Sequence, residues 1–121
     1  MAKDNIVRTK SFAFAIKIVT MYKYLVDHQK EFVLSKQLLR SGTSIGANIR
    51  EADNAESKAD FIHKMSIAQK ETDESLYWLE LLKETNYLSE TEYNSISSDA
   101  NEILKLVRSI IISSKNNIHR S

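Results

Sequence analysis

The chain of 121 residues contains no cysteine and no proline, and its only glycines are Gly42 and Gly46. The lack of cysteine excludes disulfides and thiolate-ligated zinc sites. Sheet proteins need turn-forming residues at every hairpin, which this sequence does not supply, whereas long helices need few of them. Since 42% of the residues are hydrophobic and 27% are charged, the composition is that of a globular chain. These features predict an all-α fold.

Long apolar runs are also missing. No stretch approaches the roughly 20 apolar residues that cross a bilayer, and the N-terminus lacks the charged-then-apolar pattern of a secretory signal. We therefore expect a cytoplasmic protein without membrane contact. A length of 121 residues is typical of a single domain, here residues 1–121, with one hydrophobic core.

Apolar residues recur at helical spacing in four segments, which predicts helices over about residues 8–28, 36–54, 58–85 and 90–115. The connections are only a few residues long, which favours antiparallel neighbours and an up-and-down four-helix bundle. In the first segment the apolar arc is unusually wide, and this width predicts contacts with more than one neighbour. The arc consists of Phe12, Phe14, Ile16, Ile18, Val19, Tyr22, Leu25 and Val26.

Polar residues at the segment ends predict where the helices begin and end. Ser35 is a candidate N-cap of the second helix, and Asn54 can end that helix in the left-handed conformation. Asn86 is a reasonable end for the third helix. The third and fourth helices each open with a serine followed three residues later by an acid, which is the capping-box spacing: Ser57 with Asp60, and Ser89 with Glu92.

The segment from Arg40 to Asn48 carries both glycines and resembles, at first sight, a phosphate-binding loop. It lacks the Gly-Lys-Ser/Thr ending of a P-loop, and no strand precedes it. On a helix, Gly42 and Gly46 are four residues apart, and such spacing lets a neighbouring backbone approach closely. Each glycine costs about 1 kcal/mol in a helix relative to alanine, so we expect a close helix contact that offsets this cost.

Polar residues of the same helix leave alternatives open. The amide of Asn48 lies at the edge of the apolar face, where it could bond across helices. Arg40 and Glu51 lie with Ser44 on the polar side. For these two charges, an interhelical or intersubunit ion pair competes with a solvated face.

The third helix carries a second apolar patch, formed by Ile67, Tyr77, Trp78 and Leu81, away from its main apolar face. A monomer would leave this patch in water, and such a group of aromatic and aliphatic side chains is typical of an interface. We therefore predict self-association. The two aromatic residues could also stack nucleobases, but single-strand binders place aromatics in a cationic groove, and this helix is acidic.

The sequence offers little for catalysis. Asp60 and His63 have the i, i+3 spacing of a metal-ligand pair in a bundle. A di-iron bundle needs two such pairs with glutamate and two further inward carboxylates, and this chain has only the one. We expect a protein that is not an enzyme and that uses no metal, cofactor or small-molecule substrate.

The net charge of +1 is unevenly distributed. Residues 1–31 carry six basic and three acidic side chains, and the chain beyond Glu102 has four basic residues and no acid. A solvated polar face explains most such patterns, and a basic edge that binds nucleic acid is the alternative. The candidate nucleic-acid contacts are Lys3, Arg8, Lys10, Lys17, Lys115 and Arg120.

Three stretches of the chain carry a family resemblance. The run Leu38-Leu-Arg-Ser-Gly-Thr-Ser-Ile-Gly-Ala-Asn-Ile-Arg-Glu51, followed by Ser57-Lys-Ala-Asp-Phe61, strongly resembles the bacterial four-helix-bundle proteins encoded in intervening sequences of 23S ribosomal RNA genes. The stretches that resemble the third and first helices of that family are Lys70-Glu-Thr-Asp-Glu-Ser-Leu-Tyr-Trp-Leu-Glu-Leu-Leu82 and Lys10-Ser-Phe-Ala-Phe-Ala15. Within the first run, Gly42, Ser44, Gly46, Asn48 and Glu51 form the family motif that the resemblance implies. Many members have glycine where this chain has Ala52, and the difference bears on where the second helix ends.

The resemblance implies an up-and-down bundle that assembles as a ring-like homopentamer. It also implies kinship with the accessory variability proteins of diversity-generating retroelements, which bind nucleic acid and a partner reverse transcriptase through a strongly basic pentamer. Five copies of this chain carry only +5, so that activity does not carry over directly. Two functions remain open. One is an oligomeric module that binds RNA or DNA in connection with 23S rRNA intervening sequences, and the other is an oligomeric protein-binding scaffold without nucleic-acid contact.

Overall fold

A computed structural model describes the backbone of residues 2–120 and the side chains of residues 5–116. This part of the chain forms four helices and no strand, which confirms the all-α prediction. The helices are α1 (Ala2–Asp27), α2 (Leu34–Asp53), α3 (Lys58–Glu84) and α4 (Glu90–Arg120). Compared with the predicted limits, α1 begins earlier and α4 continues for about one more turn, while the inner boundaries agree within two residues.

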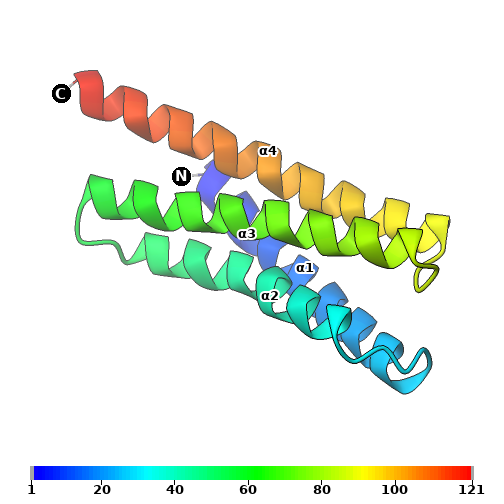
Figure 1. The fold of residues 1–121 in the computed structure, drawn as a ribbon. Helices are drawn as coiled ribbons and strands as arrows, with labels where there is room; N and C mark the ends of the chain where they lie inside the picture. The colour runs from blue at the N-terminus through cyan, green and yellow to red at the C-terminus, as the bar shows by residue number, and fades with distance from the viewer. Residues whose placement is uncertain (1, 121) are drawn as a thin grey trace.

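The four helices surround one core in an antiparallel, up-and-down order (Figure 1). Helix α2 packs against α1 and α3, and α4 packs against the same two helices, so each helix has two neighbours. Within the described residues the backbones of α1 and α3 do not approach each other closely, because these helices lie diagonally across the bundle. The largest fully buried side chains include Phe14, Ile18, Leu25, Leu38, Ile45, Ile49, Met65, Leu79, Leu82 and Ile103.

The starts of α3 and α4 follow the capping patterns in the sequence. The Ser57 hydroxyl accepts the backbone N–H of Asp60 at 3.0 Å. At α4 the bonds are reciprocal: the N–H of Glu92 donates to Ser89 Oγ at 3.1 Å, and the N–H of Ser89 donates to Glu92 Oε1 at 2.8 Å. Asn86, just after α3, has a φ of 70°, the left-handed conformation that ends a helix. These three local predictions are confirmed.

The start of α2 differs from the prediction. Ser35 is not the N-cap, because the helix already begins at Leu34 and the Ser35 hydroxyl donates to the Glu31 carbonyl at 2.8 Å. Instead the buried carboxylate of Glu31 accepts the backbone N–H groups of Val33, Leu34 and Ser35 at 3.2, 2.9 and 2.7 Å. Burial alone would raise the pKa of Glu31, but these hydrogen bonds outweigh it and hold the pKa below its ordinary value of 4.5.

The end of α2 also differs. Asn54 has a φ of −107°, so it does not adopt the left-handed conformation expected of it. Its backbone N–H bonds back to the Glu51 carbonyl at 3.1 Å, and its side-chain amide donates to the Arg50 carbonyl at 3.2 Å. Because these bonds satisfy the last carbonyls of the helix, no left-handed residue is needed there.

The glycine pair of α2 brings this helix close to α1. A Cβ placed on Gly42 would lie 2.8 Å from Ile18 Cγ1, and a Cβ on Gly46 would lie 3.4 Å from Ser11 Oγ. The first distance is too short for two carbon atoms, so Gly42 is required for the observed approach of the two helices. This confirms the interpretation of the glycine segment as a packing device, with α1 as the neighbour.

Candidate interaction surfaces

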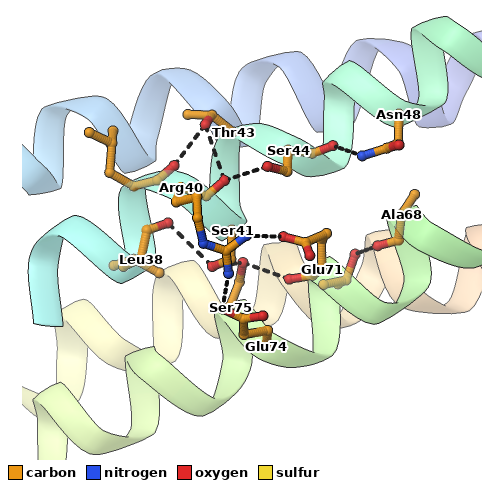
Figure 2. Close-up of polar contacts among 12 residues, drawn as sticks. Leu38, Arg40, Ser41, Thr43, Ser44, Asn48, Ala68, Glu71, Glu74 and Ser75 are labelled. Atoms are coloured by element: carbon orange, nitrogen blue, oxygen red, sulfur yellow. Dashed lines mark hydrogen bonds and ion pairs between the residues drawn. The ribbon is translucent and has the colours of Figure 1, made fainter.

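The motif segment of α2 faces α3 across a polar seam (Figure 2). The buried hydroxyl of Ser75 lies 2.9 Å from Ser41 Oγ and 2.9 Å from the Glu71 carbonyl. Thr72, also buried, donates to the Ala68 carbonyl at 2.7 Å. These hydroxyls all have partners within the bundle, so the seam is a packing feature that contributes to helix register.

Arg40 lies at the outer edge of this seam and holds two acids of α3. Its Nη1 is 3.0 Å from Glu71 Oε2, and its Nη2 pairs with Glu74. The indole N–H of Trp78 donates to Glu74 at 3.0 Å. This hydrogen bond, followed by that from Arg40, outweighs burial and lowers the pKa of Glu74, while the hydrogen bond to Glu74 raises the pKa of Arg40. Arg40 therefore joins α2 to α3 through ion pairs with both acids.

The other motif residues also act within the bundle. Arg40 and Glu51 do not pair with each other: Glu51 binds Lys64 of α3 at 3.1 Å. Arg40 and Glu51 therefore each form an interhelical ion pair with α3, which is one of the alternatives that the sequence left open. The Asn48 amide donates to the Ser44 carbonyl at 2.8 Å within α2, and not across helices, which the sequence had left open.

The second apolar patch of α3 is partly exposed. Tyr77 is 57% exposed and stands edge-on to Trp78, with 5.0 Å between the ring centroids. Ile67 and Leu81 are half-buried. Trp78 is also half-buried and packs against the edge of the core, so it is more closely tied to the bundle than the sequence pattern indicated. Whether the patch contacts another subunit stays a prediction.

The wide apolar arc of α1 divides into two faces. Phe14 and Ile18 enter the core, whereas Phe12 and Ile16 are 52% and 54% exposed, and Val19 is also exposed. Arg50 of α2 lies over the Phe12 ring, 5.0 Å from its centroid. The outer face thus has no apolar neighbour within the described part of the chain. Its residues were not among the predicted interface residues, although the width of the arc was the signal that could have identified them.

Several predicted nucleic-acid contacts are paired with acids. Arg8 lies 3.2 Å from Asp53, Lys10 lies 3.0 Å from Glu102, and Lys17 lies 2.5 Å from Asp99. Lys10 and Lys17 therefore face α4. The side chains of the predicted contacts Lys3 and Arg120 lie outside the described residues, and Lys115 is exposed.

The outer face of α4 carries an unpaired cationic strip. Lys105, Arg108 and Lys115 are exposed, and none has an ion pair among residues 5–116. Shallow hollows along the same face are also lined by the amides of Asn94, Asn101 and Asn116. The sequence pointed to this strip through the absence of acids beyond Glu102, but Lys105 and Arg108 were not among the predicted contacts. We call these three cations the α4 strip.

Other kinds of site find little support in the described part of the chain. No group of three or more His, Cys, Asp or Glu side chains there could hold a metal ion. None of its helices is both long enough and apolar enough to cross a membrane.

Known proteins resemble this chain in sequence and in structure. A family model described as 23S rRNA-intervening sequence protein matches residues 3–109. The chain belongs to this family. A crystal structure of a protein of unknown function from the S23 ribosomal protein family of Bacteroides thetaiotaomicron is 61% identical, with a TM-score of 0.90 over 90% of this chain and 97% of that one. No curated protein matches the chain.

Membership confirms the family resemblance of the sequence and agrees with the four-helix fold. In this 23S rRNA-intervening sequence protein the motif residues of α2 lie within the matched range, and their contacts are made to α1, to α3 or within α2. The motif thus accounts for helix packing. The surfaces that these contacts leave exposed include the outer faces of α1, α3 and α4.

Proposed function

We propose that this protein is a non-enzymatic subunit of a cytoplasmic homo-oligomer, a pentamer as the family resemblance implies, which binds nucleic acid in connection with 23S rRNA intervening sequences. The observation that carries the binding part is the α4 strip. The exposed apolar face of α1 supports the oligomer.

The chemistry of the α4 strip suits a phosphate backbone. Lys105 and Lys115 are ten residues apart, which is about 15 Å along a helix, so the strip can reach more than one phosphate. Lysine, arginine and asparagine are among the side chains that bind phosphate oxygens. Because a pentamer carries only +5, its net charge adds little, and binding depends on the local strip.

A salt series with a structured RNA hairpin and a DNA duplex of equal length tests the proposal. The triple variant Lys105→Gln, Arg108→Gln, Lys115→Gln should bind the nucleic acid on the order of 100-fold more weakly at about 0.1 M salt, since each lost phosphate contact removes close to one unit from the slope of log K against log salt. Comparing the two probes distinguishes RNA from DNA.

The control carries the same loss of charge elsewhere. Lys30, Lys36 and Lys58 are exposed and have no ion pair in the described structure, so Lys30→Gln, Lys36→Gln, Lys58→Gln is matched in charge. We expect it to retain most of the affinity. Equal losses in the two triple variants would refute the α4 strip as the site, and no binding by the wild type at about 50 mM salt would refute nucleic-acid binding itself.

A protein-binding scaffold without nucleic-acid contact is the second candidate. The near-neutral charge and the exposed Tyr77 on α3 favour it. A protein partner that is retained after nuclease treatment, together with no mobility shift of RNA or DNA, would support this function.

A further inference from the structure

We infer that copies of this chain associate head to tail, with the outer face of α1 in one copy lying against the outer face of α3 in the next. The α1 face is defined by Phe12, Ile16 and Val19, and the α3 face by the patch around Tyr77. The inference rests on the self-association part of the proposed function and names the two surfaces that meet.

Each face exposes apolar groups that nothing in the bundle covers. On α1 the exposed side chains lie at positions 12, 16 and 19, the spacing that aligns them along one side of a helix. On α3 the exposed ring of Tyr77 stands beside the half-buried Leu81, one turn further along. Aromatic and aliphatic groups clustered in this way are typical of the centre of a protein interface.

The charges around the two faces are complementary. Lys23 continues the α1 face one turn beyond Val19, and Arg50 lies over Phe12 at its other end. Beside Tyr77 on α3 are Asp73 and Glu80, exposed acids with no ion pair within the described side chains. Each rim also has one charge of the opposite sign, Asp27 on α1 and Lys70 on α3.

This charge distribution argues against pairing of identical faces. Two α1 faces brought together would place Lys23 and Arg50 of one copy near the same cations of the other. Two α3 faces would do the same with Asp73 and Glu80. Like charges held close at an interface repel each other and so disfavour such partners. An α1 face against an α3 face brings opposite charges together.

The positions of the two faces favour the same arrangement. In the described backbone α1 and α3 occupy diagonal positions in the bundle, so their outer faces point away from each other. A twofold contact would cover only one of them and leave the other in water. A head-to-tail contact covers both and continues from copy to copy until it closes into a ring or extends as a filament. The α4 strip belongs to neither face and stays open to solvent.

A mixing experiment tests the pairing. The single variants Ile16→Glu, on the α1 face, and Tyr77→Glu, on the α3 face, each break one half of every contact. Both positions are exposed, and circular dichroism verifies that the variants fold. Light scattering should show an assembly larger than a dimer for the wild type and a monomer of 13.9 kDa for each variant. An equimolar mixture should form a one-to-one dimer and nothing larger, because each dimer joins the intact α1 face of Tyr77→Glu to the intact α3 face of Ile16→Glu.

Other results would overturn the pairing in distinguishable ways. If Ile16→Glu is monomeric while Tyr77→Glu still assembles, α1 pairs with itself or with a surface other than the α3 face, and the inference is wrong, although self-association stands. Two monomeric variants that form no dimer on mixing also contradict it. A monomeric wild type would remove both the inference and the oligomer of the proposed function, whereas binding of RNA through the α4 strip is measured separately. If a glutamate variant does not fold, Ile16→Ser and Tyr77→Ser take its place with the same expected outcomes.

Discussion

Helices α1 and α4 both place one face in the core and carry cations elsewhere, but their outer surfaces differ. The outer face of α1 is largely apolar, and Lys10 and Lys17, on another side of the same helix, are paired with acids of α4. The outer face of α4 is largely polar, although Ile112 is 60% exposed there, and Lys105, Arg108 and Lys115 have no ion pair among the described residues. The first surface therefore suits contact with protein, and the second suits contact with anions. The ion pairs of Lys10 and Lys17 also show that acids on α4 neutralise part of the basic cluster that the sequence indicates on α1.

The largest effect should come from the inner face of α1. Phe14 is 1% exposed, and Phe14→Ala should lower the free energy of unfolding by about 3–5 kcal/mol through lost burial and a cavity. Phe12→Ala on the outer face should cost about 1 kcal/mol or less within a subunit, mainly the contact with Arg50. Urea unfolding at two protein concentrations checks this, because any further loss from Phe12→Ala should depend on concentration. Equal losses in both variants would contradict the division of α1 into two faces.

The next effect concerns the close approach of α2 to the inner face of α1. Gly42→Ala forces a methyl group onto Ile18, and we expect a net loss of about 1–2 kcal/mol, since overpacking exceeds the helix preference of alanine. Gly46→Ala meets Ser11 at an ordinary distance and should be neutral or stabilising by up to about 1 kcal/mol. Thermal and urea unfolding of the two variants provide the measurement. A Gly42→Ala protein as stable as Gly46→Ala would argue that the helices are not in close contact there.

Removing the acids that pair with the α1 lysines tests whether ion pairing keeps these lysines from binding nucleic acid. Asp99→Asn with Glu102→Gln frees Lys17 and Lys10, and we expect nucleic-acid affinity to rise about tenfold at about 0.1 M salt. A mobility-shift titration measures the change. The matched control is Glu56→Gln with Glu90→Gln, two exposed acids without an ion pair in the described structure. If the control rises equally, net charge and not the freed lysines sets the affinity.

Much of the fold could be predicted because its signals are local. The apolar period of α4 and the bonds between Ser89 and Glu92 depend on residues a few positions apart. The Gly42 contact was also predictable in kind, since glycine in a helix needs a compensating neighbour. The sequence could not predict which helix approaches Gly42, because that depends on the packing of the whole bundle.

The interaction surfaces were harder to predict for the same reason. The acids that bind Lys10 and Lys17 lie more than 80 residues further along the chain, so no local pattern relates them. The width of the α1 arc was visible, but its division between core and surface depends on where α2 and α4 pack. The sequence pattern also could not show that Trp78 packs against the core while Tyr77 is exposed.

The smallest effect is expected at the helix starts, where the caps of α2 and α4 differ in burial. The buried Glu31 carboxylate caps α2, whereas Ser89 and Glu92 cap α4 at the surface. Because the pKa of Glu31 is lowered on folding, its contribution is fully present above the ordinary value of 4.5 and is lost as the pH falls through the lowered value. Glu31→Gln should therefore cost about 1 kcal/mol at neutral pH, and the difference from wild type should shrink below pH 4.5. Urea unfolding at several pH values measures it. Glu92→Gln should cost less at neutral pH, since water can replace the exposed hydrogen bond of Glu92. If the difference between Glu31→Gln and wild type stays constant with pH, the charge of Glu31 does not stabilise the start of α2.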